Sequence, residues 1–192
     1  MKKVFLFLYP INEYFQFYKY YETQYQNPLE ILNQSINQRY RNKGYEVVFA
    51  LFPDTNLYGI NKHEQDQIIY TDITLESFIT NPVPVYPNEQ KLINQIGNFN
   101  KIVLAGFHET DCVKRVAQYC YQQGYDTLID IDLTDNFFVL AKDTNYFKID
   151  EYNPIKLKEH LLSKDPSAKR LLTRKYQHPM YNMNIGNKYK KK

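Results

Sequence analysis

The chain has 192 residues, 43% of them hydrophobic, and a formal net charge of +3 at pH 7. This is enough apolar material for one domain with a sizeable core, and the alternation of strand-like and helix-like segments favours an α/β fold. Two cysteines exclude a disulfide framework, and the apolar run at residues 4–8 is too short for a membrane span or a signal peptide. We therefore expect a soluble, cytoplasmic protein with no membrane segment.

The first part of the chain predicts two strands separated by a helix. Residues 3–9 form an apolar run typical of a strand, and an aromatic-rich loop is expected over residues 14–25. Pro28 suits the first turn of a helix, because its missing N–H would be unpaired there. Residues 46–52 form the apolar run expected of a buried parallel strand. The apolar face of the helix consists of Leu29, Leu32, Ile36 and Tyr40.

The remainder of the chain repeats this alternation. The three prolines of residues 81–87 exclude a helix there, because proline removes a hydrogen-bond donor and biases its neighbours to extended geometry. The other expected elements are a strand at 67–70, a helix beginning near Leu92, a strand at 101–105, a helix at 113–121, strands at 127–130 and 137–141, and a helix at 154–162.

The segment Gly-Phe-His-Glu-Thr-Asp-Cys-Val, residues 106–113, places Cys112 at the start of the helix that follows a strand. The unpaired N–H groups and the dipole of a helix N-terminus stabilise a thiolate, which is the nucleophilic form of cysteine. The alternative is a small buried hydrophobe, because free cysteine is among the most buried residue types. Cys120, on the apolar face of the helix, is expected to lie in the core.

The same segment resembles the isochorismatase-like cysteine hydrolases, a superfamily that includes nicotinamidases. In that family an apolar strand is followed by a glycine, a short turn containing threonine, and a Cys-Val pair that opens a helix. Gly106, Thr110, Cys112 and Val113 match this pattern, with Thr110 one place closer to the cysteine than usual. The Gly-Tyr pair and the apolar run with an acidic end at residues 124–130 are also similar to the family.

The resemblance implies a three-layer α/β/α fold with a mostly parallel, Rossmann-like central sheet. Residues 1–163 would form this single domain, and residues 164–192 a basic tail. Members of the family commonly self-associate, so a homo-oligomer is expected. The inherited pocket would lie at the C-terminal ends of the strands and accept a small molecule. No cofactor is expected, and no metal, because the chain has no paired-cysteine zinc pattern, HExxH motif or Gly-rich phosphate loop.

Two of the family's three catalytic residues are replaced. Tyr9 stands where the family has the Asp that takes the thiol proton, and Tyr70 or Thr71 stands where it has a Lys. Tyrosine is a poor base, since its pKa is about 10, and neither replacement for the Lys carries a positive charge. Glu13, just after the first strand, is the candidate substitute base.

The expected catalytic residues are thus Cys112 as nucleophile, if the chain is active, and Glu13. The side chains expected to line the binding site are Tyr9, Tyr70, His108 and Thr110.

The basic residues are concentrated at the end of the chain. Residues 164–192 contain nine Lys or Arg and one Asp, so the preceding residues are net negative. Such a tail could bind the phosphates of nucleic acid, with an affinity that falls as salt rises. The alternative is a solvated tail without a partner.

Three functions are consistent with these patterns. The favoured one is a protein of this fold that lacks the usual Asp-Lys-Cys hydrolysis and acts by binding a small molecule or by assembling subunits. The second is a cysteine hydrolase that attacks a small amide or related C–N bond through Cys112. The third is a nucleic-acid-associated protein that uses its basic tail. The first is favoured because two catalytic positions are replaced.

Overall fold

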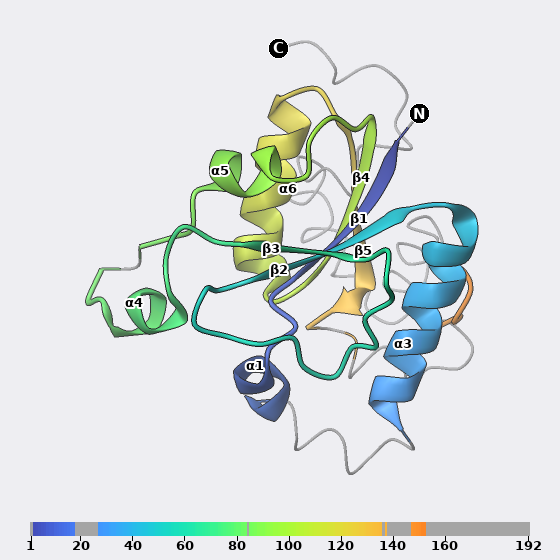
Figure 1. The fold of residues 1–192 in the computed structure, drawn as a ribbon, viewed down its shortest axis with the longest axis horizontal. Helices are drawn as coiled ribbons and strands as arrows, with labels where there is room; N and C mark the ends of the chain where they lie inside the picture. Colours follow the sequence, from blue (N-terminus) through green and yellow to red (C-terminus); the bar gives the residue numbers. More distant parts are fainter. Residues whose placement is uncertain (1, 18–26, 84, 136, 138–146, 153–192) are drawn as a thin grey trace, which may run out of the picture.

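A computed structural model of the chain describes residues 2–17, 27–83, 85–135, 137 and 147–152. In these residues five strands form one sheet in the order β3-β2-β1-β4-β5, and every pair of neighbours is parallel (Figure 1). The strands are β1 (Lys3–Leu8), β2 (Glu46–Leu51), β3 (Gln67–Tyr70), β4 (Lys101–Gly106) and β5 (Asp126–Thr134).

Helices cover both faces of this sheet. In Figure 1, α3 lies on one side of the strands, and α5 and α6 lie on the other. The architecture is therefore the expected three-layer α/β/α arrangement. The helical segments are α1 (Asn12–Phe17), α3 (Pro28–Arg39), η1 (Arg41–Lys43), α4 (Leu75–Thr80), α5 (Glu89–Asn94), η2 (Glu109–Val113) and α6 (Lys114–Gln122).

The central strand β1 is apolar at successive positions because both of its faces are buried. Val4, Leu6 and Leu8 pack into the core cluster beneath α5 and α6. Phe5 and Phe7 point to the opposite face and pack with residues of α3. Successive side chains of a strand alternate between faces, so a strand covered by helices on both sides needs an apolar residue at every position.

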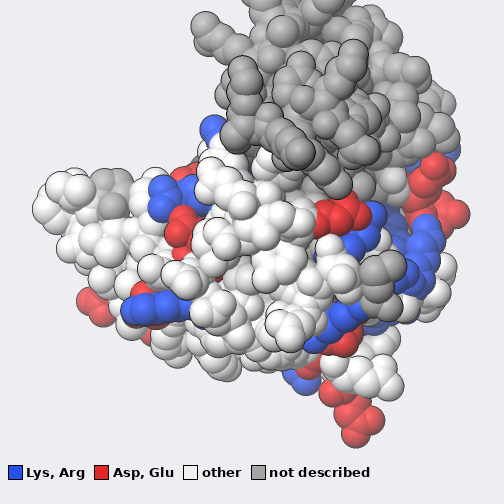
Figure 2. All heavy atoms as spheres, turned by 90° about the horizontal axis from the view of Figure 1, so that it is seen from above, with Lys and Arg blue, Asp and Glu red and all other residues white. Residues whose placement is uncertain are grey.

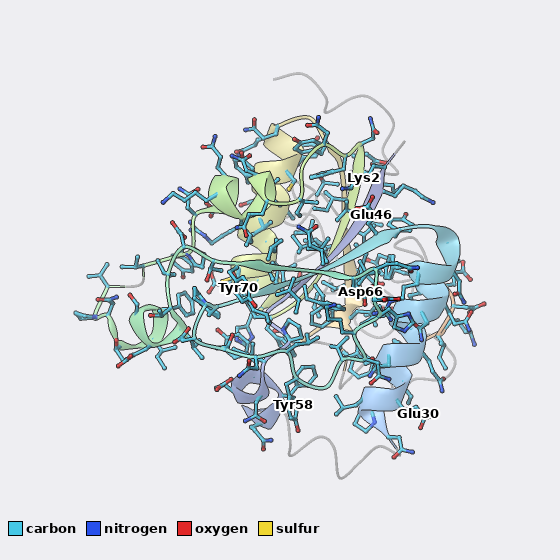
Figure 3. All side chains as sticks on the ribbon, viewed as in Figure 1. Lys2, Glu30, Glu46, Tyr58, Asp66 and Tyr70 are labelled. Atoms are coloured by element: carbon cyan, nitrogen blue, oxygen red, sulfur yellow. The ribbon has the colours of Figure 1, made fainter. Side chains whose placement is uncertain are left out.

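The strand ends are aligned at one edge of the sheet. In the parallel ladders, Leu8 at the end of β1 lies beside Ala50 of β2 and Gly106 of β4. At the opposite edge Lys2 and Glu46 form an ion pair of 2.8 Å, which is labelled in Figure 3. The C-terminal edge therefore brings together the segments that follow β1, β2 and β4.

Three sequence-based expectations need correction. The loop expected from residue 14 begins as helix α1, which reaches Phe17; residues 18–26 lie outside the described residues. Strand β5 runs to Thr134 rather than to residue 130. Phe137, expected in a strand, is helical.

Several other expectations fall outside the described part of the chain. These are the rest of the expected strand at 138–141, the helix at 154–162, and the basic tail at 164–192. Among the described residues, no helix is both long enough and apolar enough to cross a membrane.

Candidate functional site

Gly106 shapes the edge of the sheet at which the candidate site lies. Its φ is +102°, and a Cβ at this position would lie 2.1 Å from the carbonyl oxygen of Leu8. That same oxygen accepts a 3.0 Å hydrogen bond from the N–H of Phe107, and a cis peptide bond joins Phe107 to His108. Only glycine permits this approach of β4 to β1, so the turn that carries Cys112 starts directly beside the end of β1.

Cys112 lies in η2, the turn of π-helix between β4 and α6, and its side chain is buried. Burial raises the pKa of its thiol to about 12, and the neighbouring Asp111 carboxylate acts in the same direction. Arg115 acts to lower this pKa but does not compensate. The position at the start of a helix therefore does not produce the expected thiolate, because burial and a nearby negative charge outweigh the helix dipole.

Tyr9 follows the last residue of β1 and faces the same site. Its side chain is 1% exposed, and its ring stacks on Phe52 with centroids 4.6 Å apart. Burial raises the pKa of Tyr9, with a further contribution from Cys112, and both residues belong to the core cluster beneath α5 and α6. The hydroxyl stays protonated at neutral pH and cannot serve as the base that the family's Asp provides.

Tyr9 belongs to a continuous series of aromatic rings, which we call the aromatic arc. Centroids of consecutive members are 4.6 to 6.4 Å apart, within the range of favourable ring contacts. The segments that supply the rings follow β1, β2 and β4 or belong to α1, α4 and the Pro-rich connector. In spatial order, the aromatic arc consists of His108, Tyr14, Tyr9, Phe52, Phe78 and Tyr86.

Both ends of the aromatic arc are held at η2. His108 directly precedes this turn, and its Nδ1 lies 3.7 Å from an oxygen of Asp135. At the other end, the guanidinium of Arg115, just after η2, lies 4.1 Å from the centre of the Tyr86 ring, and the nearby charge of the Asp111 carboxylate is the largest cause that raises the pKa of Tyr86. The arc thus starts and finishes beside the turn that contains Cys112.

Of the residues predicted to form the site, the structure brings Cys112, Tyr9 and His108 together. Thr110 is exposed in η2, and Glu13 is exposed on α1.

Tyr70 is not part of the aromatic arc. It lies on the edge strand β3 with 45% of its surface exposed (Figure 3). The side chain of Gln95 bonds to its backbone, accepting from the Tyr70 N–H at 3.2 Å and donating to the Tyr70 carbonyl at 2.7 Å. Thr71, the other residue at the family's Lys position, is buried and donates its hydroxyl to the carbonyl of Ile73.

Sequence reasoning missed most of the aromatic arc. Phe52 directly follows β2, so the alignment of parallel strand ends could have placed it beside Tyr9. Phe78 belongs to α4 and Tyr86 to the Pro-rich connector. The positions of these two segments are set by tertiary packing, so the local sequence does not indicate that their rings lie beside Phe52. Asp130, expected at the acidic end of a strand, lies inside β5 together with Asp132, and both pair with Arg39 at 3.0 Å.

No metal centre is evident in the part of the chain that the structure describes, since it contains no group of three or more His, Cys, Asp and Glu side chains able to hold an ion. No protein-family model and no curated protein matches the chain. A solved Leishmania major structure, provisionally named a MAR1 ribonuclease, is similar at 11% identity over 73% of this chain and 71% of that one, with a TM-score of 0.46. This similarity is too low to support any functional inference.

Proposed function

We propose that the aromatic arc and Cys112 form a small-molecule binding site in a protein that lacks the Asp-Lys-Cys hydrolysis of the isochorismatase-like family. The observation that carries this proposal is the burial of Cys112, which raises the pKa of its thiol to about 12, in a site where the pKa of the Tyr9 phenol is raised as well. The aromatic arc supplies the apolar walls that most small-molecule sites have, with a few polar groups to orient the ligand.

Catalysis by cysteine needs a thiolate and a group that carries its proton to the leaving group. A thiol with a pKa of about 12 is almost entirely protonated at neutral pH. Tyr9 cannot take the proton, because its own pKa is raised by burial and by Cys112. Glu13 is exposed on α1, and Thr71 and Tyr70 carry no charge that would replace the Lys.

The rate of Cys112 alkylation by iodoacetamide, measured against pH on the full chain, tests this proposal. We expect slow alkylation in the folded protein, with no titration below about pH 9, and rapid alkylation after unfolding in urea. Cys112→Ala is the control that isolates any signal from Cys120, which is 0% exposed and whose thiol pKa is raised by burial to about 12. An apparent pKa below about 8.5 would instead favour the hydrolase acting on a small amide through Cys112.

Self-association, which the family resemblance implies, stays a prediction. It is favoured by exposed apolar side chains on and after α4: Ile79 is 65% exposed and Val83 is 73% exposed. Light scattering on the full chain and on Ile79→Glu tests it, with a shift towards monomer expected if a second copy covers this surface.

Nucleic-acid binding also stays a prediction, and it depends on the tail at residues 164–192, outside the described residues. On the face seen in Figure 2, the charged side chains of the described residues occur in small groups of mixed sign rather than as one extended basic surface. Removal of the tail should therefore abolish any binding to nucleic acid.

A further inference from the structure

We propose that the outer edge of β3 pairs with β3 of a second copy of this chain, and that the side chain of Gln95 closes this edge in the single chain. The proposal goes beyond the proposed binding site at Cys112 and does not depend on it. It follows from the hydrogen bonds of Gln95, from the residues that β3 presents at its edge, and from the charges beside the strand.

In the part of the chain that the structure describes, β3 is an edge strand whose neighbour is β2. The backbone groups of successive residues in a strand point to alternate sides. The N–H of Thr71 donates to the carbonyl of Leu51 in β2 at 2.9 Å, so position 71 faces β2. Ile68 and Tyr70 therefore face the outer edge. An open edge of this kind is a template for pairing with another strand.

The side chain of Gln95, at the end of α5, takes the place of a neighbouring peptide group at this edge. Its Oε1 accepts a 3.2 Å hydrogen bond from the N–H of Tyr70, which is labelled in Figure 3, and its Nε2 donates to the Tyr70 carbonyl at 2.7 Å. Nε2 also donates to the carbonyl of Lys91 at 3.2 Å. A carboxamide offers the same donor and acceptor as a peptide group. Gln95 thus satisfies Tyr70 as a paired strand would, and a second strand reaches Tyr70 only when this side chain moves away.

The two outward residues of β3 fit a second copy in antiparallel pairing. When the two-fold axis of the dimer passes through Ile69, Ile68 of one copy lies opposite Tyr70 of the other. Residues opposite each other in this way exchange both of their backbone hydrogen bonds. A β-branched residue opposite an aromatic one is also a favourable cross-strand pair. The symmetry produces this pair twice, so the edge of β3 is complementary to itself.

The charges beside β3 permit this pairing. None of residues 67–71 is charged. Asp66, before the strand, forms an ion pair with Arg41, and Asp72, after it, lies 3.1 Å from Nζ of Lys91. Each carboxylate has its own cation, which reduces the repulsion where Asp66 of one copy approaches Asp72 of the other. Edge strands are often protected by a lysine. Because β3 contains none, Gln95 is the group that closes its edge.

The test compares Gln95→Ala with Gln90→Ala by sedimentation equilibrium of the full chain over a range of concentrations. Gln95→Ala removes the internal competitor for the Tyr70 backbone, so the dissociation constant for self-association should fall about tenfold or more relative to wild type. Gln90 is also exposed on α5 but forms no hydrogen bond to β3 in the described part of the chain. The same substitution at Gln90 is therefore the matched control and should leave self-association unchanged.

Hydrogen exchange of single amides measures the pairing directly. In Gln95→Ala, the outward N–H groups of Ile68 and Tyr70 should exchange more slowly as the protein concentration rises, because pairing buries both of them. Wild type at the same concentrations should show this effect at least several-fold more weakly. If the amide of Ile68 stays unprotected at concentrations where Gln95→Ala is associated, pairing through β3 is overturned.

Two further variants in the Gln95→Ala background identify the surface responsible. Tyr70→Lys places a charge on the edge and removes the ring that lies opposite Ile68, so association should return to the wild-type level. Ile79→Glu, on the exposed apolar surface of α4, should leave the gain in association intact. The proposal fails if Tyr70→Lys does not reverse the gain, if Ile79→Glu abolishes it, or if Gln95→Ala associates no more tightly than Gln90→Ala.

Discussion

At the scale of single residues, Gly106 is required for two reasons: its backbone has a positive φ, and it lies against the backbone of β1. Gly106→Ala would place a Cβ 2.1 Å from the Leu8 carbonyl oxygen at a φ of +102°, so both a clash and an unfavourable φ result. We expect a loss of about 3 kcal/mol or more in the free energy of unfolding, measured by urea denaturation.

Gly124 provides the control for this prediction. Its φ is +88°, but a Cβ there would meet no atom within 4 Å. Gly124→Ala should therefore cost only the conformational penalty of about 1 kcal/mol. Equal losses for the two variants would show that the approach of β4 to β1 is not what requires glycine at position 106.

At the scale of elements, the start of α4 is stabilised by the carboxylate of Asp54, which lies in the loop between β2 and β3. Asp54 accepts hydrogen bonds from the N–H groups of Leu75 at 2.7 Å and of Glu76 at 3.2 Å. Slight desolvation acts to raise the Asp54 pKa, but these backbone donors lower it overall. Asp54→Ala should reduce the free energy of unfolding by about 1 kcal/mol at pH 7, as for the loss of a helix cap.

The pH dependence of this loss has a defined sign. A carboxyl whose pKa is lower when folded stabilises the protein above its unfolded pKa, and this contribution disappears as pH falls through the folded pKa. The difference between wild type and Asp54→Ala in urea denaturation should therefore hold from pH 7 to about pH 5 and shrink towards pH 3. A difference that is constant over this range would contradict a role for the ionised carboxylate.

The interior of the sheet could be predicted from sequence, because residues buried on both faces leave a continuous apolar run. The end of β5 could not. Asp130 and Asp132 resemble turn-forming residues locally, but Arg39 from α3 neutralises them inside the sheet, 91 residues away for the first. The same limit applies to the candidate site: the turn with Gly106 and Cys112 has a local pattern, whereas the aromatic arc exists only after α4 and the connector have packed.

At the scale of the whole molecule, Arg39 connects three distant parts of the chain. From α3 its Nη1 lies 3.0 Å from oxygens of both Asp130 and Asp132 in β5. Its Nε donates to the carbonyl of Ile149 at 3.2 Å, and its Nη2 donates to the carbonyl of Lys148. Burial acts to lower the pKa of Arg39, but the two carboxylates outweigh it and raise that pKa above the ordinary value, so the group stays charged.

Replacement of Arg39 should therefore destabilise the entire fold rather than one helix. Arg39→Met leaves two buried carboxylates without their cation, and removal of one partner of a buried ion pair costs about 3–5 kcal/mol in the free energy of unfolding. Arg39→Lys keeps the charge but cannot reach all of these acceptors with one ammonium group, so it should lose less than Arg39→Met and more than nothing. Lys101→Met, which breaks a partly exposed pair with Asp126, is the control and should cost under about 1 kcal/mol. If urea denaturation gave the same stability for Arg39→Met and Lys101→Met, the contacts of Arg39 with the two aspartates and the two backbone carbonyls would not be what holds β5 and residues 147–149 against α3.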